Sequence, residues 1–241
     1  PVDAILLYGV PTVGLQVWAA ARRFDVPVFF RSIDVLHRLV PHPFLVTPTK
    51  LLEQFVYKRV RAITCVTYHL KKYVESFGVP EERIEVLPSG VDRDMFSPGA
   101  PNHELMARWQ IAPSHRLILF MGTVYTFSGL DQVIRDFPAL LARHPNARLL
   151  IVGEGDDTDR LKALCREIGV RDEVVFTGLQ PYELLPDFIR SADVCINPFE
   201  LNSITRDILP TKLFQYLSCA KPVLATELPG TLPFLSGEEQ G

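Results

Sequence analysis

The sequence lacks the features that mark several common protein classes. Its 241 residues contain no run of 18 apolar residues, so no membrane-spanning helix is predicted. The formal net charge is only −3, which argues against a nucleic-acid-binding protein. The four cysteines form no CxxC pair and the six histidines show no metal-ligand spacing. We therefore expect no structural zinc site, no metal and no bound cofactor.

The scarce cysteines also bear on the cellular compartment. Each of them, Cys65, Cys165, Cys195 and Cys219, lies in an apolar run of the sequence. Isolated cysteines in such runs are typical of buried free thiols in a reducing environment. No signal peptide is visible, and we expect a cytoplasmic protein.

Apolar runs alternate with amphipathic patterns from one end of the chain to the other. The predicted strands are residues 4–8, 26–31, 62–67, 83–87, 117–122, 147–152, 173–176, 194–197 and 222–226. The predicted helices are residues 13–24, 50–59, 69–77, 130–143, 159–168, 182–191 and 211–217. Continuous Val/Ile/Leu-rich strands between helices indicate parallel sheets covered on both faces. The fold class is therefore α/β, with Rossmann-like doubly wound parallel sheets.

A break interrupts this alternation at residues 92–114. The segment contains three prolines, one glycine and few residues that favour strands. Such a composition is typical of a linker between domains. We place the domain boundary near residue 98, with one domain at residues 1–97 and a second at residues 98–241.

Glycine turns and polar residues follow the predicted strands of the second domain. Gly122 and Thr123 end one strand, Gly153 and Gly155 follow the next, and Gln180 follows a third. Glycine permits sharp turns and close approach of the backbone to a ligand. In an open parallel sheet, ligands bind beyond the carboxyl ends of the strands. The alternative at each position is an ordinary strand–turn–helix connection.

The helix predicted to open at Pro210 carries Thr211 and Lys212 in its first turn. A helix N-terminus offers unpaired N–H groups and a partial positive charge, so it suits an anion such as phosphate. A lysine there is unfavourable for the helix dipole, and a bound anion would explain it. The alternative is a solvated lysine.

The stretch at residues 153–160, GEGDDTDR, has the look of an acidic metal cluster. A glycine turn at a strand end, followed by aspartates at a helix N-terminus, explains the same pattern better. We therefore expect no metal here.

Five segments resemble, in order and spacing, the retaining GT-B glycosyltransferases of glycosyltransferase family 4, or group 1. Residues 63–99 carry Pro88, Gly90, Val91, Asp92 and Phe96 at matching positions, and the other segments are residues 117–123, 149–157, 174–199 and 221–226. The family's first strand and glycine-rich loop, and its last strands, have no counterpart here. We expect a chain truncated at both ends, with both GT-B domains incomplete.

The resemblance implies transfer of a sugar from a nucleotide-sugar donor to a hydroxyl acceptor with retention at the anomeric carbon. The acceptor would be a glycan, a lipid-linked molecule or a small molecule. The donor is a substrate, and no metal is implied. The donor-binding residues would be Gly122, Thr123, Gly153, Gly155, Gln180, Thr211, Lys212 and Gln215.

The resemblance also implies three catalytic residues, Asp34, His37 and Asp207. Asp207 and Gln215 occupy the positions of the family's paired acidic residues. In the first domain, Asp34 takes the position of the aspartate in the family's His-Asp pair, and His37 could supply the imidazole if the loop is bent. The alternatives are a helix cap for Asp34, a surface role for His37 and an exposed helix position for Gln215.

The chain departs from the family where an arginine and a lysine clamp the donor diphosphate after the glycine turn. Thr123 and uncharged residues stand there instead. This departure, with Gln215 for an acidic residue, supports two alternatives. One is a non-catalytic binding or scaffold subunit, and the other is a different nucleotide-sugar enzyme, such as an epimerase.

A basic cluster in the first domain bears on the acceptor. Its members are Lys58, Arg59, Arg61, Lys71 and Lys72, with Phe55, Tyr57 and Tyr73 near by. Such a cluster is usually a solvated surface. The alternative is peripheral contact with an anionic membrane, which a lipid-linked acceptor would favour.

Overall fold

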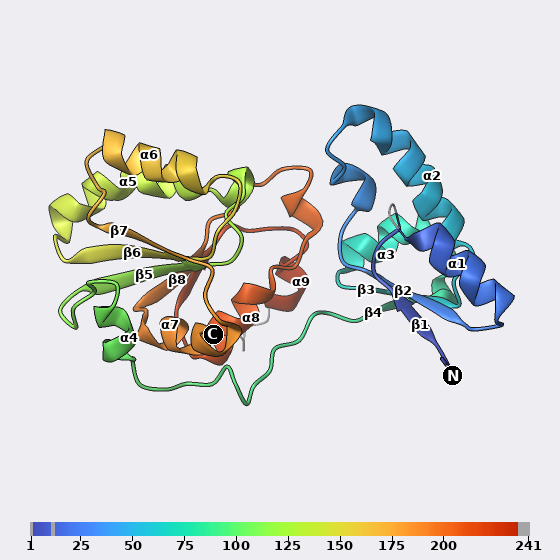
Figure 1. Cartoon of the computed structure of the whole chain (residues 1–241), viewed down its shortest axis with the longest axis horizontal. Helices are drawn as coiled ribbons and strands as arrows, with labels where there is room; N and C mark the ends of the chain where they lie inside the picture. The colour runs from blue at the N-terminus through green and yellow to red at the C-terminus, as the bar shows by residue number, and fades with distance from the viewer. Residues whose placement is uncertain (1, 11–12, 236–241) are drawn as a thin grey trace. The chain divides into compact units, whose positions relative to one another are not determined.

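The computed structural model describes residues 2–10 and 13–235 and falls into two compact units (Figure 1). Unit 1 takes in the chain up to Ser89, residues 201–209 and the described residues after 226. Unit 2 comprises residues 90–200 and 210–226. The division of the whole protein into domains at residues 1–97 and 98–241 stays a prediction.

Unit 1 is built on four parallel strands that follow each other in chain order. The strands are β1 (Ile5–Leu7), β2 (Val28–Ser32), β3 (Ala62–Cys65) and β4 (Ile84–Val86). The helices are α1 (Gly14–Arg23), α2 (Val46–Tyr57), α3 (Tyr68–Glu75) and α9 (Leu232–Leu235), with 3₁₀ turns at Leu36–Arg38, Pro43–Leu45 and Glu81–Arg83. All four strands were predicted, within two residues at each end.

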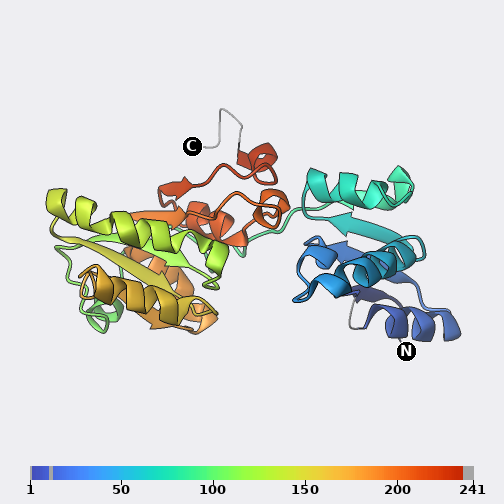
Figure 2. The same ribbon diagram turned by 90° about the horizontal axis from the view of Figure 1, so that it is seen from above.

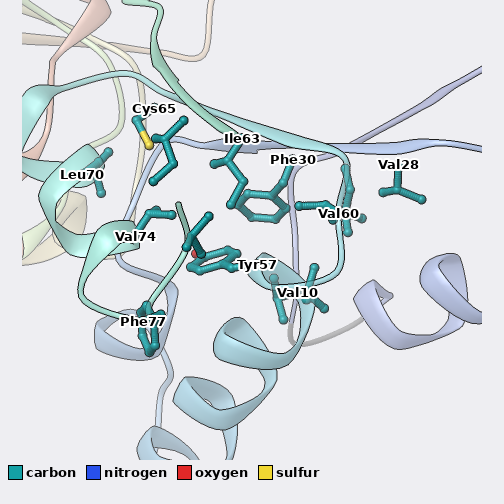
Figure 3. Packing of buried hydrophobic residues seen from close by; sticks show 14 of the residues in the cluster. Val10, Val28, Phe30, Tyr57, Val60, Ile63, Cys65, Leu70, Val74 and Phe77 are labelled. Carbon is teal, nitrogen blue, oxygen red and sulfur yellow. The ribbon is translucent and has the colours of Figure 1, made fainter. Parts of the chain in front are cut away.

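The core of unit 1 forms where strand side chains meet aromatic side chains from the helices. Figure 3 shows Phe30 of β2 and Ile63 of β3 beside Tyr57, with Phe77 farther along. The Phe30 and Tyr57 ring centres lie 5.0 Å apart, and Tyr57 and Phe77 are 5.7 Å apart. Alternate strand residues point to one face, so the apolar pattern of β2 and β3 places these side chains together.

Unit 2 has five parallel strands in the order β7-β6-β5-β8-β9. They are β5 (Arg116–Met121), β6 (Ala147–Val152), β7 (Val174–Gly178), β8 (Val194–Asn197) and β9 (Val223–Ala225). The helices are α4 (His103–Ala107), α5 (Leu130–Arg143), α6 (Thr158–Glu167), α7 (Leu185–Ser191) and α8 (Thr211–Ser218). The strand order reverses at β5, so the chain makes a topological switch point between β5 and β8.

Helices cover both faces of this sheet. Within unit 2, α5 and α6 lie on one face and α4, α7 and α8 on the other (Figure 1, Figure 2). The second face buries Leu117, Leu119 and Met121 of β5 against side chains of α4, α7 and α8. The predicted parallel-sheet α/β architecture is confirmed in both units.

Local chemistry explains where the elements differ from the predictions. Helix α2 begins at Val46, before the predicted residue 50, because Pro48 is tolerated in a first helical turn. The helix predicted at residues 182–191 is a 3₁₀ turn, Tyr182–Leu184, followed by α7 with Pro186 in its first turn. The short helix α4 was not predicted; Asn102 caps it by accepting from the Leu105 N–H at 3.0 Å.

Tyr216 of α8 connects this helix to the end of β5 through a hydrogen bond. The buried N–H of Met121 donates to the Tyr216 hydroxyl oxygen at 2.8 Å, and burial raises the pKa of this phenol well above its usual value. Replacing Tyr216 with phenylalanine leaves that N–H without a partner, which costs about 1–3 kcal/mol of unfolding free energy. Urea denaturation measures the loss. The matched change at half-exposed Tyr182 should cost less than about 0.5 kcal/mol, and equal losses would contradict the prediction.

Candidate functional site

Two glycine turns pack against each other at the carboxyl ends of β5 and β6. Gly122 and Gly153 have φ values of +129° and +132°, which side chains rarely adopt. A Cβ on Gly153 would lie 2.2 Å from the Gly122 carbonyl oxygen, and one on Gly155 would lie 2.3 Å from that of Val124. The Val124 N–H also donates to the Glu154 carbonyl at 3.2 Å. The two turns therefore meet backbone to backbone, which only glycine permits.

Lys212 reaches from the first turn of α8 to this pair of turns. A Cβ on Gly122 would lie 2.9 Å from the Lys212 Nζ, so the missing side chain makes room for the ammonium. Nζ lies 4.0 Å from the centre of the Phe120 ring and 4.5 Å from that of Phe199. These rings hold the cation through their π faces without neutralising it.

The charge of Lys212 is not compensated by the part of the chain that the structure describes. The residue is 9% exposed, and Nζ has neither a hydrogen-bond acceptor nor a carboxylate partner among the described residues. Burial lowers the pKa of the Lys212 ammonium from 10.5 to about 7. Since a buried charge without a partner is costly, the arrangement is suited to an anionic ligand.

Asn197, the last residue of β8, is a second buried polar group at this end of the sheet. Its side chain is fully buried, and neither amide atom has a hydrogen-bond partner within the described ranges. Buried amides are nearly always satisfied, so a water or a ligand is expected to bind these two atoms. Asn197 is not among the residues predicted from the sequence. The available signal was a polar residue closing an otherwise apolar strand, VCIN.

The remaining predicted donor residues lie on the same strand ends and on α8. Thr123 is exposed directly after Gly122. Gln180 follows β7, and its Nε2 donates to the Thr177 carbonyl at 2.9 Å. Thr211 is exposed at the start of α8, and Gln215 is half-buried one turn later. The structure thus gathers Gly122, Gly153, Gly155 and Lys212, and ligand contacts by all of the predicted donor residues stay predictions.

The acidic stretch after Gly153 is engaged in a local ion pair. Arg160 donates from Nε to one Asp157 oxygen at 2.5 Å and from Nη2 to the other at 2.6 Å. Thr158, not Asp157, accepts from a backbone N–H at the start of α6, that of Gly155 at 3.0 Å. Among the described residues, no group of three or more His, Cys, Asp or Glu side chains could hold a metal ion.

The three predicted catalytic residues all belong to unit 1. Asp34 follows β2, and burial raises the pKa of its carboxyl group. His37 lies in the 3₁₀ turn Leu36–Arg38, and its catalytic role stays a prediction. The His37 Nδ1 atom lies 2.9 Å from the Glu53 carboxylate and 2.9 Å from the Tyr73 hydroxyl.

Asp207 accepts hydrogen bonds from Arg38 and Thr67, one through its side chain and one through its backbone. Its Oδ2 accepts from Arg38 Nη1 at 3.0 Å, and its carbonyl accepts from the Thr67 hydroxyl at 3.2 Å. The same Arg38 atom donates to the Ser203 carbonyl at 2.8 Å. The Asp207 carboxylate is therefore part of an ion pair with Arg38, a partner that the sequence did not indicate. Its catalytic role stays a prediction.

The basic cluster of unit 1 is only partly a charged surface. Lys58, Arg59 and Arg61 are exposed, whereas Lys71 is paired with Glu81 at 2.7 Å. Tyr57 is fully buried and so adds no aromatic surface to the cluster. Over residues 2–10 and 13–235, no helix combines the length and apolar character needed to cross a membrane.

The α/β fold of the two units has counterparts among solved GT-B structures. The Anabaena protein HepE, in a complex with UDP-glucose, superposes with a TM-score of 0.74 at 16% identity, over 93% of this chain and 60% of that one. WaaG, a glycosyltransferase of lipopolysaccharide biosynthesis, gives 0.68 at 18% identity, over 92% of this chain and 65% of that one. These matches confirm the predicted GT-B fold.

Family models cover most of the chain. Residues 115–241 match the glycosyl transferases group 1 model, and residues 2–95 match that of glycosyltransferase family 4. The chain therefore belongs to the group 1 glycosyltransferases, as the resemblance implied.

Curated relatives agree with this assignment. An uncharacterized glycosyltransferase of Methanocaldococcus jannaschii is 30% identical over 77% of this chain and 47% of its own length. A D-inositol 3-phosphate glycosyltransferase of Acidothermus cellulolyticus is 28% identical over 75% of this chain and 41% of its own length. The chain spans about half the length of the curated relatives it matches.

Proposed function

We propose that this protein transfers a sugar from a nucleotide-sugar donor to a hydroxyl acceptor with retention of the anomeric configuration. The observation that carries the proposal is Lys212, a buried lysine that has no carboxylate partner among the described residues and lies beside the glycine turns of Gly122 and Gly153. Two similar proteins support the donor class. HepE was solved with UDP-glucose, and a 30% identical relative from Mycolicibacterium smegmatis is named as a GDP-mannose-dependent mannosyltransferase.

In this proposal, unit 2 stabilises the negative charge of the leaving diphosphate. Lys212 supplies a positive charge, and the first N–H groups of α8 supply a partial one. The turns at Gly122 and Gly153 let backbone groups approach the phosphates closely. Because the Lys212 side chain is largely buried beside Phe120 and Phe199, its attraction to phosphate would be stronger than that of a fully solvated lysine.

The other predicted residues complete the proposal. The hydroxyls of Thr123 and Thr211 would donate to phosphate oxygens, and Gln215 would hold the ribose hydroxyls. Gln180 would face the base. Asp34, His37 and Asp207 would contact the reacting sugar or the acceptor. The acceptor is a glycan, a lipid-linked molecule or a small molecule, and no metal or cofactor takes part in the proposal.

We also place the protein in the cytoplasm. All four cysteines are free and buried, and burial raises the pKa of the Cys65 and Cys195 thiols to about 12. Such thiols are inert and fit a reducing compartment. Peripheral membrane contact through Lys58, Arg59 and Arg61 remains part of the proposal.

A binding or scaffold role is the second candidate. The observation favouring it is that exposed Thr123 follows the glycine turn, where the family carries an arginine of the cationic clamp. Such a subunit would bind a nucleotide sugar through Lys212 without turning it over. Measurement of both binding and turnover separates the two candidates.

Titration calorimetry with UDP-glucose and GDP-mannose, together with an assay of donor hydrolysis and transfer, tests the proposal. Lys212→Ala should weaken binding of the preferred donor by about 1.5–3 kcal/mol, because a charge-assisted hydrogen bond is lost. The matched control is Lys162→Ala, which removes an exposed lysine of α6 and should leave affinity unchanged. Binding without turnover would support the scaffold role, and equal affinity in both variants would remove Lys212 from the site.

A further inference from the structure

A carboxylate is fully buried in unit 1, where α2, α3 and the turn Leu36–Arg38 meet. Glu53 of α2 is 0% exposed. One of its oxygens accepts from the Leu36 N–H at 3.2 Å and from the Tyr57 hydroxyl at 3.1 Å. The other lies 2.8 Å from the Tyr73 hydroxyl and 2.9 Å from His37 Nδ1. Four neighbours therefore surround the four acceptor positions of one carboxylate.

With Glu53 as a carboxylate, a single arrangement of protons satisfies the contacts at its second oxygen. Tyr73 has a single hydroxyl proton, which can go to Glu53 or to His37 Nδ1, since both lie within 2.9 Å of it. If it went to Nδ1, the Nδ1 lone pair would also face an acceptor-only Glu53 oxygen. If Tyr73 donates to Glu53 instead, Nδ1 must carry a proton and donate as well. The cluster therefore places a proton on His37 Nδ1, facing Glu53.

Burying the Glu53 carboxylate costs free energy that a purely structural role does not explain. Moving a carboxylate out of water costs several kcal/mol, and apolar residues of similar size commonly replace such groups without loss of stability. His37 is the only ionisable base hydrogen-bonded to Glu53 among the residues that the structure describes. Burial and the nearby charge of Glu53 raise the pKa of the Tyr73 phenol, which keeps it a proton donor. We therefore infer that Glu53 and Tyr73 orient the His37 imidazole.

We propose that Glu53 is a positioning residue for His37. Because Glu53 accepts a hydrogen bond from Nδ1–H, the opposite ring nitrogen, Nε2, is the atom available to accept a hydrogen bond from a ligand hydroxyl. The His37 side chain is 13% exposed, so the ring retains access to solvent. This inference rests on the proposed glycosyl transfer for its catalytic consequence, but the tautomer it assigns exists without any substrate. Nothing in the sequence pattern links the two residues, which are 16 positions apart.

The tautomer is measured directly by nitrogen NMR of the full-length protein labelled with ¹⁵N-histidine. The His37 signals are assigned from their loss in His37→Gln. We expect a protonated Nδ1 in the wild type and a shift toward the Nε2–H tautomer in Glu53→Gln. Tyr57→Phe is the matched control, because it removes a donor from the other Glu53 oxygen. It should lose stability yet keep the Nδ1–H signal. A wild-type protein in the Nε2–H form would overturn the proposal.

Kinetics separates positioning from folding. Glu53→Gln should lower kcat about ten- to a hundredfold with little change in KM, as expected for loss of a residue that orients a functional group. When Glu53→Gln is combined with His37→Ala, it should not lower kcat further, because the imidazole that Glu53 orients is absent from that variant. Equal losses in both backgrounds would show a merely structural role. If the wild type shows no transfer at all, the proposed function fails, while the tautomer still decides whether Glu53 holds His37.

Discussion

Replacing Lys212 with methionine is expected to stabilise the protein while it weakens donor binding. The side chain lies against Phe120 and Phe199, so methionine fills the same space without a charge. Burial lowers the pKa of the ammonium from 10.5 to about 7. The folded state must therefore either desolvate a charge or give up a proton. We expect Lys212→Met to raise the unfolding free energy near pH 7 by about 1–4 kcal/mol, the range known for apolar replacement of buried charges.

The pH dependence identifies the cause of this stabilisation. Between pH 7 and 10.5 the unfolded chain holds the Lys212 proton and the folded chain does not, so wild-type stability gains from this group as pH rises. Below pH 7 both states are protonated and the penalty is complete. The gain from Lys212→Met should thus be largest at pH 6–7 and shrink toward pH 10. Urea denaturation over that range measures it, with exposed Lys162→Met as control. A gain that does not vary with pH would contradict the assigned pKa.

Replacing Gly153 with alanine is expected to destabilise unit 2 strongly. The new Cβ would lie 2.2 Å from the Gly122 carbonyl oxygen, and the residue would keep a φ of +132°. Backbone strain and overpacking each cost about 1–3 kcal/mol, so we expect a loss of about 3–5 kcal/mol of unfolding free energy. Donor affinity should fall as well, because the Gly122 turn would have to move away from Lys212.

A second glycine gives the matched control. Gly169 also has a positive φ, of +75°, but no atom lies within 4 Å of a Cβ built there. Gly169→Ala should therefore cost only about 1 kcal/mol, from backbone strain alone. Urea denaturation compares the two variants, and nucleotide-sugar titration compares their affinity. Similar losses would mean that the backbone contact between the Gly122 and Gly153 turns does not matter.

The elements that the sequence predicted well are those governed by local chemistry. Strands such as β5 and β6 are continuous apolar runs, and α5 and α6 carry their apolar residues at helical spacing. The family resemblance rests on motifs of the same local kind. The glycine turns were also predictable, since each directly follows a buried strand.

The parts that the sequence could not supply depend on contacts between distant residues. Lys212 could be singled out from its place in a helix, but not its position between the rings of Phe120 and Phe199. The hydrogen bond from Met121 to Tyr216 spans 95 positions, and the ion pair of Arg38 with Asp207 spans 169. Glu53 reads as an ordinary polar residue of a helix. Its importance emerges only when α3 and the turn at His37 pack over it.

The membership of residues 201–209 in unit 1 constrains how the chain can be made and dissected. This segment follows β8 and precedes α8, yet Arg38 and Thr67 hold it, and the Arg206 carbonyl accepts from the Gly230 N–H at 2.8 Å. A growing polypeptide cannot finish unit 1 on the ribosome until nearly all of unit 2 has been synthesised. An N-terminal fragment ending before residue 201 would leave Arg38 without its carboxylate. Residues 201–209 therefore join unit 1 only after residues 90–200 of unit 2 have been synthesised.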